Sequence, residues 1–137
     1  MTNKSSGFTA IELLVVVAIL GIIAAIGISS YSGYVSSAKR KSAENVMQQI
    51  SLGQTEYYSD MGIYYRNSSG TSCTPSATTS TQIETNLLGG SDSINDEMGY
   101  QLCIANHSSN YLINANETGG SCEIEMTALG VITRRNC

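Results

Sequence analysis

The chain has 137 residues, enough for one domain of ordinary size or for a small domain with an appendage. Its net charge is −4, and only 13% of its residues are charged, where roughly 25% is usual for a soluble globular protein. The acidic balance argues against a nucleic-acid binder built on a broad basic surface. A single histidine excludes most metal sites and most histidine-dependent catalytic sites.

The first 28 residues form the most apolar part of the chain. From Phe8 to Ile28 the only charged residue is Glu12. A helix over this stretch would be roughly 30 Å long, about the thickness of a bilayer core. Three interpretations are open: a cleaved secretory signal with a small-residue exit around residues 24–27, a membrane anchor, or a segment that is cut before its apolar run.

The order of the residues favours the third interpretation. The chain from Lys4 to Leu14 reads KSSGFTAIELL, and a long apolar run follows it. This segment resembles the class III signal of type IV prepilins, in which a short basic leader ends at a glycine before Phe-Thr-x-Ile-Glu. The resemblance implies a leader at residues 1–7 that a prepilin peptidase removes between Gly7 and Phe8. It also implies N-methylation of the new Phe8 amine.

Glu12 is a costly charge inside an apolar run, which by itself suggests a functional partner. The resemblance implies that Glu12 meets the Phe8 amine of a neighbouring subunit while a filament grows. Such a pair would neutralise two charges that are otherwise unpaired in lipid. A helix-start capping box, Thr9-x-x-Glu12, is the alternative, and the two roles can coexist. Pilins often carry a proline where Ser29 stands, so we expect a softer helix without a proline kink around residues 21–30.

Residues 29–58 continue the helical pattern beyond the apolar stretch at 8–28. Apolar residues recur at spacings of three and four, opposite a polar face, which predicts an amphipathic half that packs on one surface. That polar face carries Lys39, Arg40 and Lys41. They either contact lipid headgroups, DNA or the next subunit, or they form a solvated helix face. Arg134 and Arg135 are further candidates for contact with DNA.

Residues 59–99 read as an αβ-loop, with a Ser/Thr-rich stretch at 67–81 that contains the only proline. Alternation of apolar and polar residues then predicts three or four antiparallel strands within residues 100–137, the first two joined by a five-residue turn at 106–110. The amphipathic helix needs a surface and the sheet needs a cover. We therefore predict an α+β protein, a long N-terminal helix packed on a small 3–4-stranded antiparallel sheet, which matches the pilin fold.

Four cysteines allow three pairings. If the apolar segment delivers the following residues across the inner membrane, the compartment is oxidising and disulfides form. We favour Cys122–Cys137, which ties the tail to the sheet and agrees with a looser similarity to PilE-type minor pilins, and this leaves Cys73–Cys103. We expect no metal site, because no cysteine pair has zinc-ligand spacing and the acidic loop at residues 92–97 lacks calcium-loop spacing.

The sequence is thus similar to type IV pilins, and most of all to PilE-type minor pilins. The resemblance implies a structural subunit without cofactor or catalysis, held in the inner membrane of a Gram-negative bacterium with its C-terminal part in the periplasm. It is later polymerised into an extracellular pilus for adhesion, twitching motility or DNA uptake. The implied partners are other pilin subunits, the prepilin peptidase and the assembly platform, with DNA as a further candidate. Two alternatives stay open: a minor pilin that receives DNA or primes assembly, and a type II secretion pseudopilin.

Overall fold

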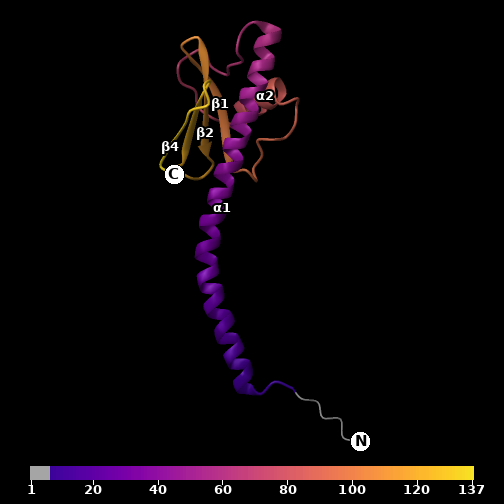
Figure 1. Ribbon diagram of the computed structural model, residues 1–137, viewed down its shortest axis with the longest axis vertical. Helices are drawn as coiled ribbons and strands as arrows, with labels where there is room; N and C mark the ends of the chain where they lie inside the picture. Colours follow the sequence, from indigo (N-terminus) through magenta and orange to yellow (C-terminus); the bar gives the residue numbers. More distant parts are fainter. Residues whose placement is uncertain (1–6) are drawn as a thin grey trace, which may run out of the picture. The chain divides into compact units, whose positions relative to one another are not determined.

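A computed structural model of the protein describes residues 7–137 (Figure 1). The predicted leader therefore lies outside the described residues, except for Gly7. Two helices are followed by four strands: α1 (Ala10–Met61), α2 (Ala77–Leu87), β1 (Tyr100–His107), β2 (Asn110–Glu117), β3 (Glu123–Thr127) and β4 (Ile132–Arg135). The long N-terminal helix and the small antiparallel sheet confirm the predicted α+β class. The chain divides into an N-terminal unit, up to Ser37, and a C-terminal unit, from Ala38 onward.

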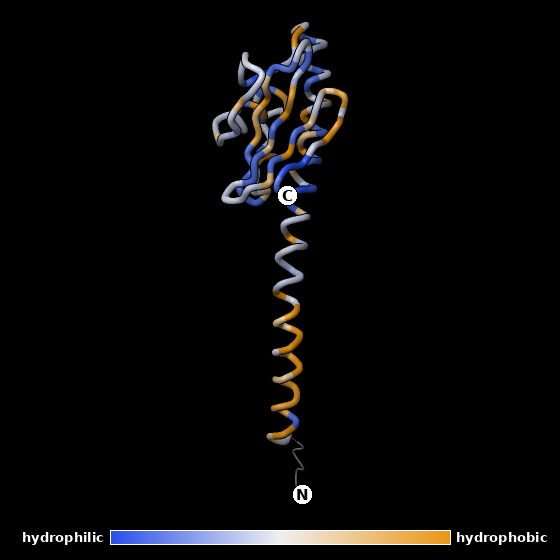
Figure 2. The backbone as a smooth tube through the Cα atoms, turned by 90° about the vertical axis from the view of Figure 1, so that its left-hand side faces the viewer, coloured by the Kyte–Doolittle hydropathy of each residue, from blue (hydrophilic) through white to orange (hydrophobic). Residues whose placement is uncertain are grey.

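The described part of the N-terminal unit consists mostly of the apolar half of α1. Figure 2 shows a nearly unbroken hydrophobic run along it. The helix continues without interruption through residues 21–30, as expected for a segment without proline. Its large apolar side chains are exposed: Ile22 by 62%, Ile26 by 65% and Ile28 by 73%. This half of the helix has no packing partner of its own within the described residues.

The sheet of the C-terminal unit has the strand order β1-β2-β3-β4, and all neighbouring strands are antiparallel. The predicted five-residue turn after β1 is wrong. Strand pairing extends to His107 and Asn110, so the turn contains only Ser108 and Ser109. Ser108 adopts a positive φ of 55°, which lets the chain reverse within this short turn.

The core lies between α1 and one face of the sheet. The helix contributes Ala43, Met47 and Ile50, all fully buried. Their spacing of three and four residues places them on one side of the helix. The strands contribute alternating apolar residues, which lie on the same face because the side-chain period of a strand is two. The fully buried strand residues of this cluster are Leu102, Ile104, Ile113, Ala115, Ile124 and Met126.

The prediction of an unbroken loop from Asn67 to Thr81 is wrong at its end, because α2 begins at Ala77. Ser76 caps this helix: its side chain accepts from the Thr79 amide, and the Thr79 hydroxyl accepts from the Ser76 amide. The Ser80 hydroxyl accepts from the Leu102 amide at 3.0 Å, and Ile83 is fully buried. The helix is thus fixed by a local cap and by tertiary contacts, neither of which gives an apolar periodicity in the sequence.

The free edge of β1 is covered by the segment that precedes α2. The backbone amide of Asn67 donates to the Ile104 carbonyl at 2.9 Å, and the Asn106 amide donates to the Gly70 carbonyl at 2.9 Å. The Asn67 side chain also accepts from the Ile104 amide. Cys103, on the second face of β1, is fully buried as well and is bonded to Cys73 of this segment.

Candidate functional site

The N-terminal segment places the predicted processing and assembly residues together at the start of α1. Phe8 is 81% exposed, and among the described residues no atom beyond its chain neighbours lies within 4 Å of the position that a Gly7 side chain would occupy. Gly7 and Phe8, the two residues at the predicted cleavage point, are therefore open to a second protein.

Glu12 takes part in the capping box that was the alternative interpretation. The Thr9 amide donates to Glu12 Oε2 at 2.9 Å, and the Glu12 amide donates to the Thr9 hydroxyl at 3.3 Å. Helix N-termini favour a carboxylate in this position because their free amides carry partial positive charge. Oε1 accepts no hydrogen bond from any described residue, so the carboxylate retains capacity for a second partner.

The apolar half of α1 forms the largest exposed hydrophobic surface of the described chain. This helix is long and apolar enough to cross a membrane, and none of its most apolar window is buried. Exposed hydrophobic surfaces of this extent mark contacts with lipid or protein. The surface begins beside Glu12, which is its single charge.

The predicted electrostatic residues are mostly engaged within the C-terminal unit. Lys41 and Arg134 both donate to the buried carboxylate of Glu44, Lys41 at 3.3 Å. These contacts, that of Arg134 above all, hold the pKa of Glu44 below its ordinary value. Ninety residues separate Glu44 from Arg134 in the sequence, and no local pattern indicates that they meet.

Of the other three basic candidates, Arg135 and Arg40 also have an internal partner. Arg135 donates to Glu125 at 3.0 Å, and an Arg40 nitrogen lies 3.5 Å from the Cys137 carbonyl oxygen. The Lys39 side chain lies against Gly99. Four of the five basic candidates thus have an internal hydrogen-bond partner, and Lys39 has none among the described residues.

The four cysteines form two disulfides, Cys73–Cys103 and Cys122–Cys137. The first fastens the segment before α2 to β1, and the second fastens the end of the chain to the start of β3. They close loops with sequence separations of 30 and 15 residues. In the chain-entropy account such loops contribute about 3.6 and 3 kcal/mol.

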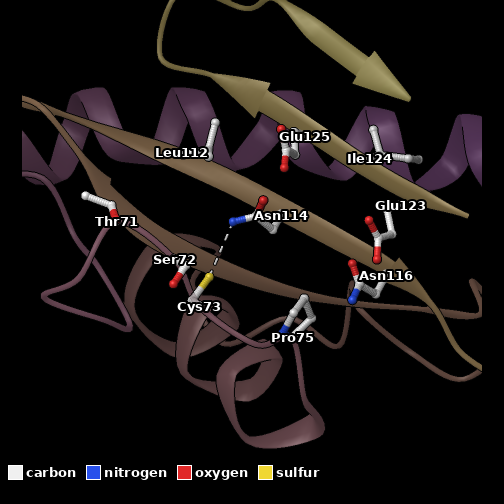
Figure 3. A pocket seen from close by; sticks show the side chains of 10 residues that line it. All are labelled: Thr71, Ser72, Cys73, Pro75, Leu112, Asn114, Asn116, Glu123, Ile124 and Glu125. Carbon is white, nitrogen blue, oxygen red and sulfur yellow. Dashed lines mark hydrogen bonds between the residues drawn. The ribbon is translucent and has the colours of Figure 1, made fainter. Parts of the chain in front are cut away.

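A groove of about 200 Å³ lies over the outer face of β2 and β3, beneath the segment that carries Cys73 (Figure 3). Asn114 pairs across the strands with Glu125, and Asn116 pairs with Glu123. The Asn114 amide reaches the Cys73 sulfur at 3.5 Å. The lining offers hydrogen-bonding groups, and no cluster of three or more metal-ligating side chains occurs anywhere in residues 7–137.

Comparison with known proteins adds sequence similarity to this geometry. The family described as the prokaryotic N-terminal methylation motif matches residues 2–28. The chain is 43% identical over 64 residues to fimbrial protein EcpC of Eikenella corrodens. The aligned residues cover 47% of this chain and 42% of that protein.

Further relatives share lower identity. The chain is 37% identical over 67 residues to a type IV major pilin protein PilE1 of Neisseria gonorrhoeae, covering 49% of this chain and 31% of the relative. Fimbrial protein Q of Moraxella bovis is 40% identical over 53 residues, which cover 39% of this chain and 32% of the relative. The matches thus span less than half the length of each relative. No solved structure matches the chain. The methylation motif lies within the first 28 residues, and the chain is similar to fimbrial proteins and type IV pilins over about half of its own length.

Proposed function

We propose that this chain is a structural subunit of a type IV pilus. It is held in the inner membrane of a Gram-negative bacterium as a prepilin, with its C-terminal unit in the periplasm. After processing it is polymerised through its N-terminal helix into a surface filament. The observation that carries this proposal is the contrast between the two units: the C-terminal unit has a complete core, whereas the apolar side chains of the N-terminal unit are exposed.

The exposed run accounts for both locations. Full burial of one Val, Leu or Ile side chain stabilises a protein by roughly 1.5–3 kcal/mol, so water is an unfavourable environment for the whole run. A bilayer covers it before assembly, and the apolar helices of neighbouring subunits cover it in the filament. Neither state requires a change in the fold of the C-terminal unit.

Glu12 supplies the specific contact in this assembly. Its Oε2 is occupied by the Thr9 amide, whereas Oε1 accepts from no described residue. Once the leader is removed, the Phe8 amine of a neighbouring subunit is a cation that fits this oxygen. In lipid, an unpaired carboxylate and an unpaired ammonium are each costly, so their pairing favours the assembled state.

Processing is tested by mass spectrometry of the mature protein. We expect a terminus at Phe8 with one added methyl group on its amine, together with the masses of peptides joined by both disulfides. A terminus near residue 28 would show that the apolar run is a cleaved secretory signal, and the filament proposal would then be wrong.

Assembly is tested with two substitutions that separate the cap from the charge pair. Glu12→Gln can still cap the helix, because glutamine serves at this position of a capping box, but it cannot neutralise an amine. We expect both Glu12→Gln and Glu12→Ala to be absent from sheared surface filaments. Glu56→Gln, an exposed change on the same helix, is the matched control and should assemble normally. Normal assembly of Glu12→Gln would refute the charge pair.

A role as a DNA receptor has less support, because Lys41, Arg134 and Arg135 are paired with carboxylates. A gel shift with the full-length chain in detergent, repeated over a series of salt concentrations, tests this role. Binding through phosphates must weaken steeply as salt is added. The pseudopilin alternative predicts calcium binding at residues 92–97, where Asp92, Asp96 and Glu97 do not converge into a ligand cluster among the described residues.

A further inference from the structure

A cavity of about 370 Å³ opens in the C-terminal unit where α1 ends and the following segment turns back. One lining residue, Tyr57, belongs to α1, and the others belong to the chain that follows it. The lining residues are Tyr57, Ile63, Tyr64, Tyr65, Arg66, Asn67, Ser68 and Ser69. Volumes of 300 Å³ and above are typical of small-molecule sites, which combine aromatic walls with a few polar groups.

The aromatic wall is held in place by ring contacts. Tyr57 and Tyr65 meet edge to face with ring centroids 5.6 Å apart. Tyr64 packs between Tyr58, at 4.6 Å, and Tyr111, at 5.0 Å. Such ring pairs are favourable beyond the area that they bury, so the rings are positioned before any ligand enters.

The backbone of the cavity wall is fixed as well. The fully buried Gln54 accepts from the Tyr65 amide at 2.8 Å and donates to the Tyr65 carbonyl at 2.7 Å. Asn67 donates to Gln82 of α2 at 2.9 Å and accepts from the Ile104 amide at 2.9 Å. The segment between these two anchors carries Arg66. A preformed site of this kind avoids most of the ordering cost of binding.

Arg66 is the only charged side chain that lines the cavity, within the part of the chain that the structure describes. One of its terminal nitrogens donates to Asn106 Oδ1 at 2.6 Å, which orients the guanidinium group. Its other nitrogens have no partner among residues 7–137. A guanidinium with free donors binds a carboxylate through two parallel hydrogen bonds. The cavity is therefore locally cationic in a chain whose net charge is −4.

We propose that this cavity binds an acidic monosaccharide, either free or as the terminal residue of a glycan. Arg66 binds the carboxylate, and the tyrosine faces, which carry negative electrostatic potential, pack against the C–H groups of the sugar ring. The hydroxyls of Tyr57 and Tyr64 have no hydrogen-bond partner among the described residues, so they are available to the hydroxyl groups of a sugar. A single-stranded nucleic acid fits less well, because one cation neutralises only one phosphate.

The test is ligand-observed NMR by saturation transfer, with the full-length chain in detergent micelles and glucuronic acid or glucose as the probe. These two sugars share a ring and differ in the carboxylate. We expect glucuronic acid to bind saturably and glucose at least tenfold more weakly. Arg66→Gln should reduce glucuronic acid binding roughly ten- to hundredfold, since hydrogen bonds to charged groups contribute about 1.5–3 kcal/mol. Arg135→Gln removes the same charge outside the cavity and should change nothing.

A disaccharide that ends in glucuronic acid distinguishes the two sources of the ligand. Tighter binding than the free sugar indicates a glycan terminus, and equal binding indicates the free sugar. Equal binding of glucose and glucuronic acid, or an unchanged Arg66→Gln variant, would overturn the proposal. Binding of an oligothymidylate in the absence of sugar binding would overturn it too. Tyr57→Leu should weaken both sugars alike, and far-UV circular dichroism checks that each variant keeps its fold.

Discussion

Glu44 is the point where the sequence-distant ends of the C-terminal unit meet, and replacing it with glutamine tests that contact. Its side chain is 6% exposed and pairs with Lys41 and Arg134, which are 66% and 42% exposed. Exposed pairs contribute roughly 0.2–1 kcal/mol each. Because the carboxylate that the two cations share is buried, we expect Glu44→Gln to lower the free energy of unfolding by about 1–2 kcal/mol at pH 7.

The pH dependence separates the charge from the shape of the side chain. Folding lowers the pKa of Glu44, mainly through the hydrogen bond from Arg134. The stabilisation is therefore complete above the ordinary value of 4.5 and is lost as the pH falls through the lower pKa of the folded state. The difference between the original chain and Glu44→Gln should disappear over that interval, because both side chains are then neutral.

Urea unfolding of the full-length chain in detergent, with disulfides intact, measures this difference through the near-UV circular dichroism of the tyrosines. With a slope of about 2 kcal/mol per molar urea, the midpoint should fall by roughly 0.5–1 M at pH 7. Glu56→Gln, an exposed change on the same helix, should leave the midpoint unchanged. A midpoint difference that persists at pH 2, or none at pH 7, would refute the reasoning.

Three further variants test the packing of the same unit by urea unfolding. Gly53→Ala should destabilise it by roughly 1–3 kcal/mol, because the added methyl group would lie 2.5 Å from the Leu87 carbonyl oxygen; an unchanged midpoint would show that α2 is free to move. Gln54→Leu leaves the Tyr65 amide and carbonyl without partners and should cost about 2 kcal/mol or more, whereas a neutral effect would mean that water replaces the glutamine. Serine at both Cys122 and Cys137 should cost about 3 kcal/mol, and a loss below 1 kcal/mol would contradict the loop-closure estimate.

The parts of the fold that follow a local rule were predictable from the sequence. The cap at Thr9 and Glu12 is a pattern of four residues, and the apolar run is visible by inspection. The buried residues of α1 recur with a period of 3.6, and those of the strands with a period of 2. Burial of one face of a helix or strand produces these periods directly in the sequence. Each of these signals lies within a short window of the chain.

The parts that were missed depend on contacts between distant residues. Helix α2 is rich in Thr and Ser, which favour caps and turns, and it is held by Ser80 against β1 and by the burial of Ile83. Glu44 and Arg134 are 90 positions apart, so no short stretch of sequence contains both partners of this pair. The same holds for the wall around Arg66, which is oriented by Asn106 on β1. These features are determined by tertiary contacts, and the local structural propensity of the residues does not reveal them.

The covered edge of β1 has a consequence for how such subunits can associate. An open strand edge offers unpaired amides and carbonyls to any other strand and so invites association without fixed geometry. Here the segment at residues 67–70 occupies the β1 edge, and the opposite edge is the four-residue β4, which carries two arginines. Short, charged edges resist strand addition. Under the filament proposal, both edges of the sheet thus disfavour sheet-to-sheet joining of crowded subunits, and contacts between them would run through the exposed helix.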